Sequence, residues 1–222
     1  KDLSSTYRIL GLTATPYRLE DVPIDFKDNF NYRVSLRDEN NSEIESSLMY
    51  LIDNQYLSRV NFIALNVGNI LSTVEGKQEL NMAALESLKK VEENNQRCVV
   101  FAQSRAHAIA LNIYFKYNGL RSALIIGATP DNQRFEILDK MRNKDLSILV
   151  NHQMLSAGLD IPGLESIMIL SDINSPSLAM QILGRAMRGP KNGGNENNTV
   201  FVTSSNYKTF EDFQLLENII NT

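Results

Sequence analysis

The sequence predicts an α/β fold in which a mostly parallel β-sheet carries helices on both of its faces. From residue 98 onward, short runs rich in β-branched residues alternate with longer segments of helical apolar spacing. Consecutive parallel strands need a crossover between them, usually a helix, so this alternation is typical of a parallel sheet. The 222 residues are 43% hydrophobic, which is enough for a substantial core.

The N-terminal part of the chain is less regular. A strand at 7–12 is expected to end at the turn formed by Thr13-Ala14-Thr15-Pro16. The polar stretch 19–42 is typical of a linker, with one short strand at 32–36. We then expect a helix, a strand and a longer helix, at 43–55, 60–67 and 77–94.

The regular part is predicted to contain strands at 98–102, 121–126, 146–151, 166–170 and 199–203. The helices between and after them are expected at 104–117, 130–142, 177–187 and 208–220. Ser104 and Thr129 each carry a hydroxyl suited to an N-cap, and Pro130 fits the first helical position. The Gly- and Asn-rich stretch 191–195 predicts a flexible loop.

Composition bounds the possible functions. The formal net charge of −4 gives no bulk polycation for non-specific binding to nucleic acid, so any nucleic acid must be held locally by a groove. The single Cys98 lies in an apolar run and is predicted to be a buried thiol in a reducing compartment. The sequence contains no signal peptide, lipidation motif or apolar run long enough for a membrane span, so we expect a cytoplasmic protein without a membrane partner.

The most informative stretch is residues 181–188, which reads Q-I-L-G-R-A-M-R. On a helix it places Gln181, Arg185 and Arg188 on one face. Gly184 removes a side chain beside them, so another surface can approach the backbone. Two guanidinium groups a helical turn apart can bind one phosphate group with paired hydrogen bonds. The plainer alternative is a solvated basic helix end, since cations favour helix C-termini.

This Q-x-x-G-R-x-x-R pattern resembles motif VI of superfamily 2 helicases and translocases. The stretch 148–162, a short strand that opens into a Gly-containing loop, resembles motif V of the same superfamily, and the T-A-T-P element at 13–16 resembles motif III. The three motifs occur in the order and approximate spacing of the family. The resemblance implies the RecA-like fold of the second helicase domain, preceded by the tail of the first RecA-like domain.

The resemblance also implies site residues. Arg185 and Arg188 would be catalytic arginine fingers directed at the γ-phosphate of ATP across an interdomain cleft. Gly158 and Asp160 of motif V, with Gln181, would line the ATP site. In motif III, Thr13 and Thr15 would couple the nucleotide state to the nucleic-acid path.

The chain lacks the P-loop pattern G-x-x-x-x-G-K-[ST] and an acidic pair after an apolar strand. We therefore expect a fragment whose missing first domain holds most of the ATP and Mg²⁺; we expect no separate metal site. The predicted division is the end of the first RecA-like domain at 1–18, a linker with a short helix at 19–60, and the second RecA-like domain at 61–222.

Ligands of open α/β sheets bind beyond the carboxyl ends of the strands. The loops there contain Ser104, Arg105, Thr129 and His152, which we predict to line a nucleic-acid path. Helix N-termini at two of these positions suit a phosphodiester, although each is also explained as an ordinary capped helix. By the same topology we expect motifs V and VI to converge with these loops on this one edge.

Departures from the DEAD-box pattern refine the subtype. His152 stands where those RNA helicases have a phosphate-binding Thr, and Gln181-Ile182 replaces their His-Arg. The stretches around 151–162 and 184–190 look more like type III restriction-enzyme-like DEAD/DEAH helicases, which favours DNA over RNA as the partner. A lone His is more often structural than functional, so both readings of His152 stay open.

Other residues have plain structural interpretations. Phe101, Tyr114 and Phe115 are predicted to be core rather than base-stacking residues, and the C-terminal helix is expected to pack on the domain. His107 is expected at the surface, and Arg134 is expected either in solvent or along a phosphate backbone.

The predicted function is the C-terminal half of an ATP-dependent helicase or translocase, inactive as an ATPase alone. A competing hypothesis is a non-catalytic nucleic-acid-binding or interaction module that kept the fold. A third hypothesis, a stand-alone nucleotide-binding α/β protein, is disfavoured because neither a P-loop nor a G-x-G-x-x-G pattern occurs.

Overall fold

The described part of the computed structural model, residues 47–65, 74–152, 161–173 and 176–212, is built around one parallel β-sheet. The strand order is β1-β6-β5-β2-β4-β3, and every pairing between them is parallel. The strands are β1 (Arg59–Leu65), β2 (Cys98–Phe101), β3 (Ser122–Ile125), β4 (Ile148–Asn151), β5 (Ser166–Ile169) and β6 (Asn197–Thr203). The fold class predicted from the sequence is therefore confirmed.

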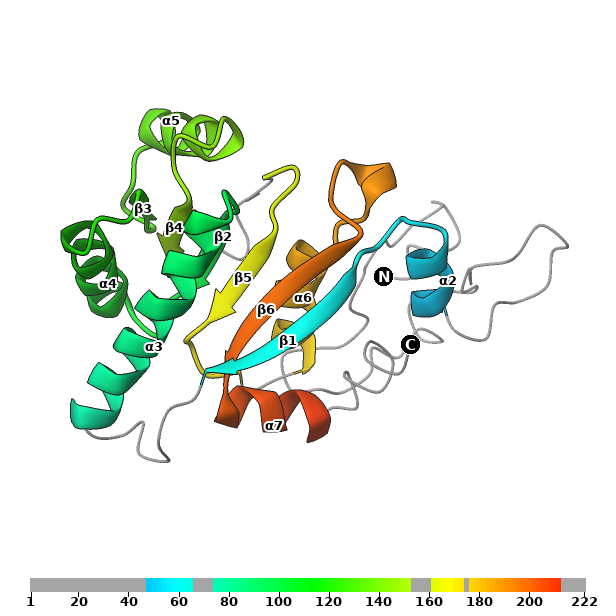
Figure 1. Ribbon diagram of the computed structural model, residues 1–222, viewed down its shortest axis with the longest axis horizontal. Coiled ribbons are helices and arrows are strands. Elements are labelled where there is room, and N and C mark those ends of the chain that lie inside the picture. The colour runs from blue at the N-terminus through cyan, green and yellow to red at the C-terminus, as the bar shows by residue number, and fades with distance from the viewer. Residues whose placement is uncertain (1–46, 66–73, 153–160, 174–175, 213–222) are drawn as a thin grey trace, which may run out of the picture.

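Helices connect the strands and cover both faces of the sheet (Figure 1). They are α2 (Ser47–Asp53), α3 (Val74–Glu93), α4 (Arg105–Tyr117), α5 (Asp131–Arg142), α6 (Pro176–Ala186) and α7 (Ser204–Asp212), with a 3₁₀ turn η1 (Pro190–Asn192) after α6. No helix among these is long and apolar enough to cross a lipid bilayer. The expected elements are present in the described ranges, with α7 beginning four residues before its predicted start.

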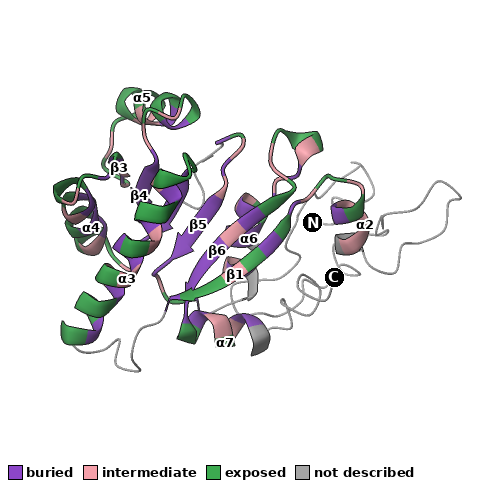
Figure 2. Cartoon of the chain, viewed as in Figure 1, coloured by how far each residue is buried: buried purple, intermediate pink, exposed green. Residues whose placement is uncertain are grey.

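Two hydrophobic clusters lie on opposite faces of the sheet because side chains alternate along each strand. On β2, Cys98 and Val100 face the cluster formed with α3 and α4, whereas Val99 and Phe101 face the cluster formed with α5, α6 and α7. Figure 2 shows the central strands as buried and the outer faces of α4 and α5 as exposed. Burial on both faces explains why the central strands read as continuous apolar runs.

The predicted core residues are confirmed. Phe101 and Phe115 are buried and Tyr114 packs against the core, while Phe210 fixes α7 to the α5–α6–α7 side of the sheet. Cys98 is buried, and this burial raises the pKa of its thiol to about 12. The strand at 7–12, the short strand at 32–36 and the end of the helix at 213–220 lie outside the described residues.

The linker and domain boundaries remain predictions. Within the predicted linker, α2 places Ile52 in the cluster that also holds Leu183 and Met187 of the α6 region. The segment before β1 thus packs against the same core as α6.

The stretch 191–195 is not the flexible loop that its composition predicted. Residues 190–192 form η1, and the backbone N–H groups of Gly193 and Gly194 donate to Pro190 O and Gly189 O at 3.0 Å each. Gly193 adopts φ +75°, a conformation that favours glycine. The glycines therefore close a hydrogen-bonded turn instead of loosening the chain.

Candidate functional site

The carboxyl edge of the sheet gathers three of the predicted groove residues. Phe101 of β2 and Ile125 of β3 are both in register with Asn151 of β4, so these three strands end at one level. Ser104, Thr129 and His152 each follow one of these strand ends. The His152 Nδ1–H group donates to Ala102 O at 3.2 Å, which ties the end of β4 to the end of β2.

Ser104 is the N-cap of α4, as predicted. Its Oγ accepts a hydrogen bond from the His107 backbone N–H at 3.1 Å, with the extended backbone that a cap residue adopts. Both Ser104 and the following Arg105 are exposed. The start of α4 therefore presents a cation beside the positive end of the helix dipole, which suits an anion.

The predicted cap at Thr129 is wrong. Pro130 occupies the N-cap position of α5 and makes no side-chain cap bond. Thr129 Oγ1 instead accepts from Ile126 N at 3.0 Å, while Thr129 N donates to Ile126 O at 2.9 Å. The hydroxyl closes the loop at the end of β3, because a bond within its own turn outcompetes the helix start.

Arg134 holds the same loop, which follows β3, in place. Its side chain is neither free in solvent nor directed along the proposed phosphate path. Its guanidinium donates to Thr129 O at 2.8 Å, to Gly127 O at 3.0 Å and to Ile126 O at 3.4 Å. These bonds use donors that a phosphate contact would need, so Arg134 holds the loop in shape. The exposed Arg105 is the better candidate for a phosphate.

His107 is not the surface residue that its sequence position suggested. Its Nδ1 accepts from Gln103 N at 3.4 Å, and its Nε2–H donates to Asn81 Oδ1 of α3 at 3.1 Å. Burial, helped by the positive charge of Lys77, lowers the pKa of the imidazole. The contact with α3 joins segments 26 residues apart, and helical spacing within 104–117 does not reveal it.

Motif VI does not converge on the carboxyl edge. Helix α6 begins there, but its 11 residues span roughly 16 Å and carry Arg185 toward the opposite end of the strands. Leu57 and Ser58 lie directly before β1. Met187 O accepts a hydrogen bond from Ser58 N at 3.0 Å, and Arg188 forms a β-bridge with Leu57. Arg185 and Arg188 therefore lie at the amino edge of the sheet.

The environment of motif VI suits a bound anion. Gln181 is exposed and Arg185 is partly buried on the same helix, one turn apart. Burial lowers the pKa of Arg185, yet a guanidinium stays charged at neutral pH. A Cβ added to Gly184 would meet no atom within 4 Å, so the described residues leave this helix open to another surface. A partly desolvated cation attracts a phosphate more strongly than one in bulk water.

Four predicted site residues, Thr13, Thr15, Gly158 and Asp160, lie outside the described residues. The end of motif V and the residues that follow it are described: Ile161 and Leu164 join the cluster that contains Ile182 and Leu183 of α6. The described end of motif V and the core side of motif VI therefore share one packed layer.

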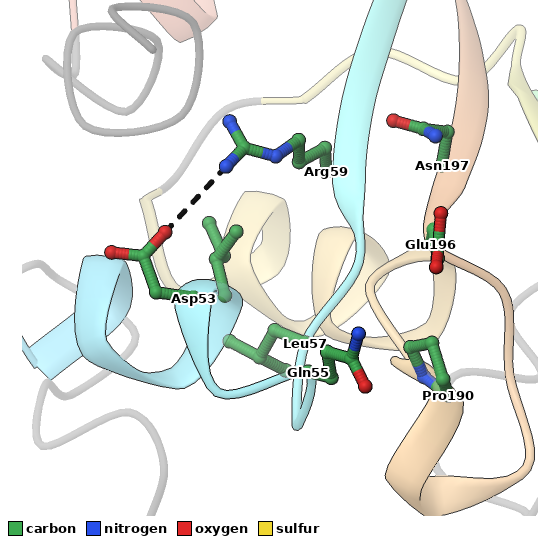
Figure 3. Close-up of a pocket in the computed structure, with 8 residues that line it drawn as sticks. Asp53, Gln55, Leu57, Arg59, Pro190, Glu196 and Asn197 are labelled. Carbon is green, nitrogen blue, oxygen red and sulfur yellow. Dashed lines mark ion pairs between the residues drawn. The ribbon is translucent and has the colours of Figure 1, made fainter.

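Sequence reasoning missed the surroundings of Arg188. The residues before β1 and the turn after α6 meet there, and a cavity of about 260 Å³ opens beside them (Figure 3). Arg59 and Asp53 form an ion pair of 3.5 Å at this cavity, which is also lined by Gln55, Leu57, Pro190 and Glu196. In the sequence this region is marked by the Gly- and Asn-rich stretch 191–195, whose composition predicts a flexible loop.

Comparison with known proteins identifies relatives. The model of the family described as "Helicase conserved C-terminal domain" matches residues 80–190. Putative ATP-dependent helicase IRC3 of Saccharomyces cerevisiae is 25% identical in an alignment of 158 residues that covers 64% of this chain and 23% of that protein. DEAD-box ATP-dependent RNA helicase 29 of Oryza sativa subsp. indica is 29% identical over 140 residues, 63% of this chain and 16% of that protein. The chain thus spans less than a quarter of the length of either relative.

One solved structure shows the shared fold. The C-terminal domain of the DEAD-box protein Dbp5 superposes with a TM-score of 0.51 at 14% sequence identity, covering 76% of this chain and 88% of that one.

Proposed function

Because the chain belongs to the family of helicase conserved C-terminal domains, we propose that it is the second RecA-like domain of a superfamily 2 ATP-dependent helicase or translocase. The observation that carries this proposal is the separation of two anion-suited regions on one sheet. Arg185 and Arg188 lie at the amino edge, whereas Ser104 and Arg105 lie at the carboxyl edge. A motor needs two coupled sites that do not overlap.

The amino-edge site would serve ATP hydrolysis. We expect a preceding first domain to hold most of the ATP and Mg²⁺, since this chain contains no P-loop. Arg185 and Arg188 would neutralise the charge that develops on the transferred phosphoryl group, with Gln181 beside them. Gly158 and Asp160 would complete the nucleotide contacts.

The carboxyl-edge site would bind nucleic acid. Ser104, Arg105, Thr129 and His152 are the proposed path, with Arg105 as the principal phosphate contact because it is exposed at a helix N-terminus. Thr13 and Thr15 would couple this path to the ATP site. The departures from the DEAD-box pattern at 151–153 and 181–182 support DNA over RNA, and a cytoplasmic location accompanies this proposal.

The test compares two arginines in the full-length protein. Arg188→Ala should lower kcat for nucleic-acid-stimulated ATP hydrolysis by about 10³–10⁵-fold, because an arginine finger acts on transition-state charge. Its affinity for a single-stranded DNA oligonucleotide should stay within about twofold, because the finger does not touch the strand.

Arg105→Ala is the matched control, with the reverse expectation. It should weaken DNA binding and reduce the slope of log affinity against log salt by about 0.7, the loss of one phosphate contact to a single strand. An RNA oligonucleotide of the same sequence tests the proposed preference. Wild-type turnover in Arg188→Ala together with lost DNA binding would instead make the motif VI helix a strand-binding surface and contradict the finger assignment. A full-length protein without any ATP hydrolysis would support the non-catalytic module.

A further inference from the structure

Arg188 is held between two backbone segments that come from distant parts of the sequence. We call the two segments, residues 55–58 and 189–195, the Arg188 clasp. Gly189 N donates to Tyr56 O and Lys191 N donates to Gln55 O, both at 3.1 Å, while Leu57 bridges Arg188 in antiparallel fashion. The residues before β1 thus form a short pairing with the residues that follow α6.

A buried polar network fastens this pairing to the end of α6. Ser58 Oγ donates to Ala186 O at 3.1 Å, and the side-chain amide of Asn198 donates to the same carbonyl and to Ser58 Oγ, the latter at 3.0 Å. Asn195 Nδ2 donates to Asn198 Oδ1 at 2.9 Å. Ser58 and Asn198 are almost wholly buried. The last carbonyl groups of a helix have no partner within the helix and normally bond to water or to a capping group. Here the buried side chains of Ser58 and Asn198 donate to the carbonyl of Ala186.

Two glycines make the close approach possible. A Cβ on Gly189 would lie 2.5 Å from Gln55 O and 2.7 Å from Leu57 N. A Cβ on Gly194 would lie 1.8 Å from the backbone O of Arg188. Both positions meet backbone atoms that cannot rotate away, so a side chain at either position would displace the clasp or Arg188 itself.

We propose that the Arg188 clasp positions Arg188 and transmits displacements of the segment before β1 to it. Ser58, Gly189, Gly194 and Asn198 are then positioning residues for ATP turnover. The proposal rests on the proposed function, in which Arg188 is an arginine finger. Its physical basis is that the backbone of Arg188 is bonded directly to the chain that leads into the sheet, so one cannot shift without the other.

Gly189→Ala tests the clasp, with Gly119→Ala as control. Gly119 lies at the end of α4 with φ +86° and has no atom within 4 Å of an added Cβ, so its variant carries backbone strain without touching the clasp. In the 222-residue chain, Gly189→Ala should speed hydrogen exchange at the amides of Ser58 and Lys191, and Gly119→Ala should not.

In the full-length protein, Gly189→Ala should lower kcat about 100-fold with the KM for ATP nearly unchanged, since misplacing a catalytic group by about 1 Å costs that much. Ser58→Ala, a milder change that removes one hydroxyl, should lower kcat in the same direction and guards against a Gly189→Ala protein that fails to fold. Combined with Arg188→Ala, Gly189→Ala should lower kcat no further, because both changes act through the same guanidinium.

The possible outcomes separate the two proposals. An unchanged kcat in Arg188→Ala would overturn the finger assignment. A large loss in Arg188→Ala, with wild-type kcat in folded Gly189→Ala and Ser58→Ala, would overturn the clasp proposal alone. A loss of kcat in Gly119→Ala as large as in Gly189→Ala would also overturn it, since general strain would then explain the effect.

Discussion

The two edges of the sheet are built differently. At the carboxyl edge the hydroxyl groups of the proposed path bond locally, because His107 N to Ser104 Oγ and Ile126 N to Thr129 Oγ1 each join residues three apart, whereas His152 bonds Ala102 across 50 residues. At the amino edge the side-chain bonds are long-range: Ser58 bonds Ala186 across 128 residues, and Arg97 bonds Glu165 across 68. The residues proposed to bind nucleic acid lie in short loops and at a helix start. The edge proposed for ATP is held by hydrogen bonds between segments that are distant in the sequence.

This difference has a functional consequence. A path that binds many sequences through phosphates needs accessible donors, which exposed loops and helix starts provide. An arginine finger needs a fixed position, because its effect depends on meeting one developing charge. Under the proposed function, the long-range contacts around Arg188 would hold that arginine in position.

Replacing Arg97 at the amino edge should have the largest effect on stability of the changes considered for the two edges. This arginine is buried beside the starts of β2 and β5, bonds Glu165 at 3.0 Å and donates to Met141 O at 3.2 Å. Arg97→Met should reduce the free energy of unfolding by about 3 kcal/mol, the lower end for breaking a buried pair, because Lys144 lies 3.3 Å from Glu165 and still offsets its charge.

Arg105→Met is the matched control at the other edge. It should change the free energy of unfolding by less than about 0.5 kcal/mol, as expected for an exposed residue. Urea denaturation of both variants measures the contrast. Equal destabilisation by the two changes would show that the edges do not differ in how they are fastened.

The sequence predicted most local features well and long-range ones poorly. The Thr129 cap and the loop at 191–195 are local predictions that were wrong. The alternation of strands and helices, the Ser104 cap and the central core were predicted because each depends on spacing within a few residues. The role of Arg134, the contact of His107 with Asn81 and the Arg188 clasp depend on segments brought together by folding. The convergence of motif VI on the carboxyl edge was wrong because a helix carries its last residues back along the strands.

A smaller effect concerns His107, which links α4 to α3 behind the carboxyl edge. Its pKa is lowered in the folded protein, so below pH 6.5 the unfolded chain binds a proton more readily than the folded one. The contribution of neutral His107 to the free energy of unfolding is therefore fully present above pH 6.5. It is lost as the pH falls toward the pKa of His107 in the folded protein. Thermal unfolding between pH 7 and pH 5 should show this loss.

His107→Gln should reduce that pH dependence, since an amide does not titrate in this range. If the wild-type chain and the variant lost stability in parallel between pH 7 and pH 5, His107 would not be the group responsible.

Chemical-shift mapping of the ¹⁵N-labelled chain with a single-stranded DNA oligonucleotide tests the separation of the two edges most directly. Ser104, Arg105 and Thr129 follow strand ends at the carboxyl edge, where the DNA is proposed to bind. The account therefore predicts that their amide signals shift on addition of DNA. The amides of Arg188 and Lys191 should remain unchanged. Shifts confined to Arg188 and Lys191 would place the nucleic acid at the amino edge and contradict the division of the sheet into two sites.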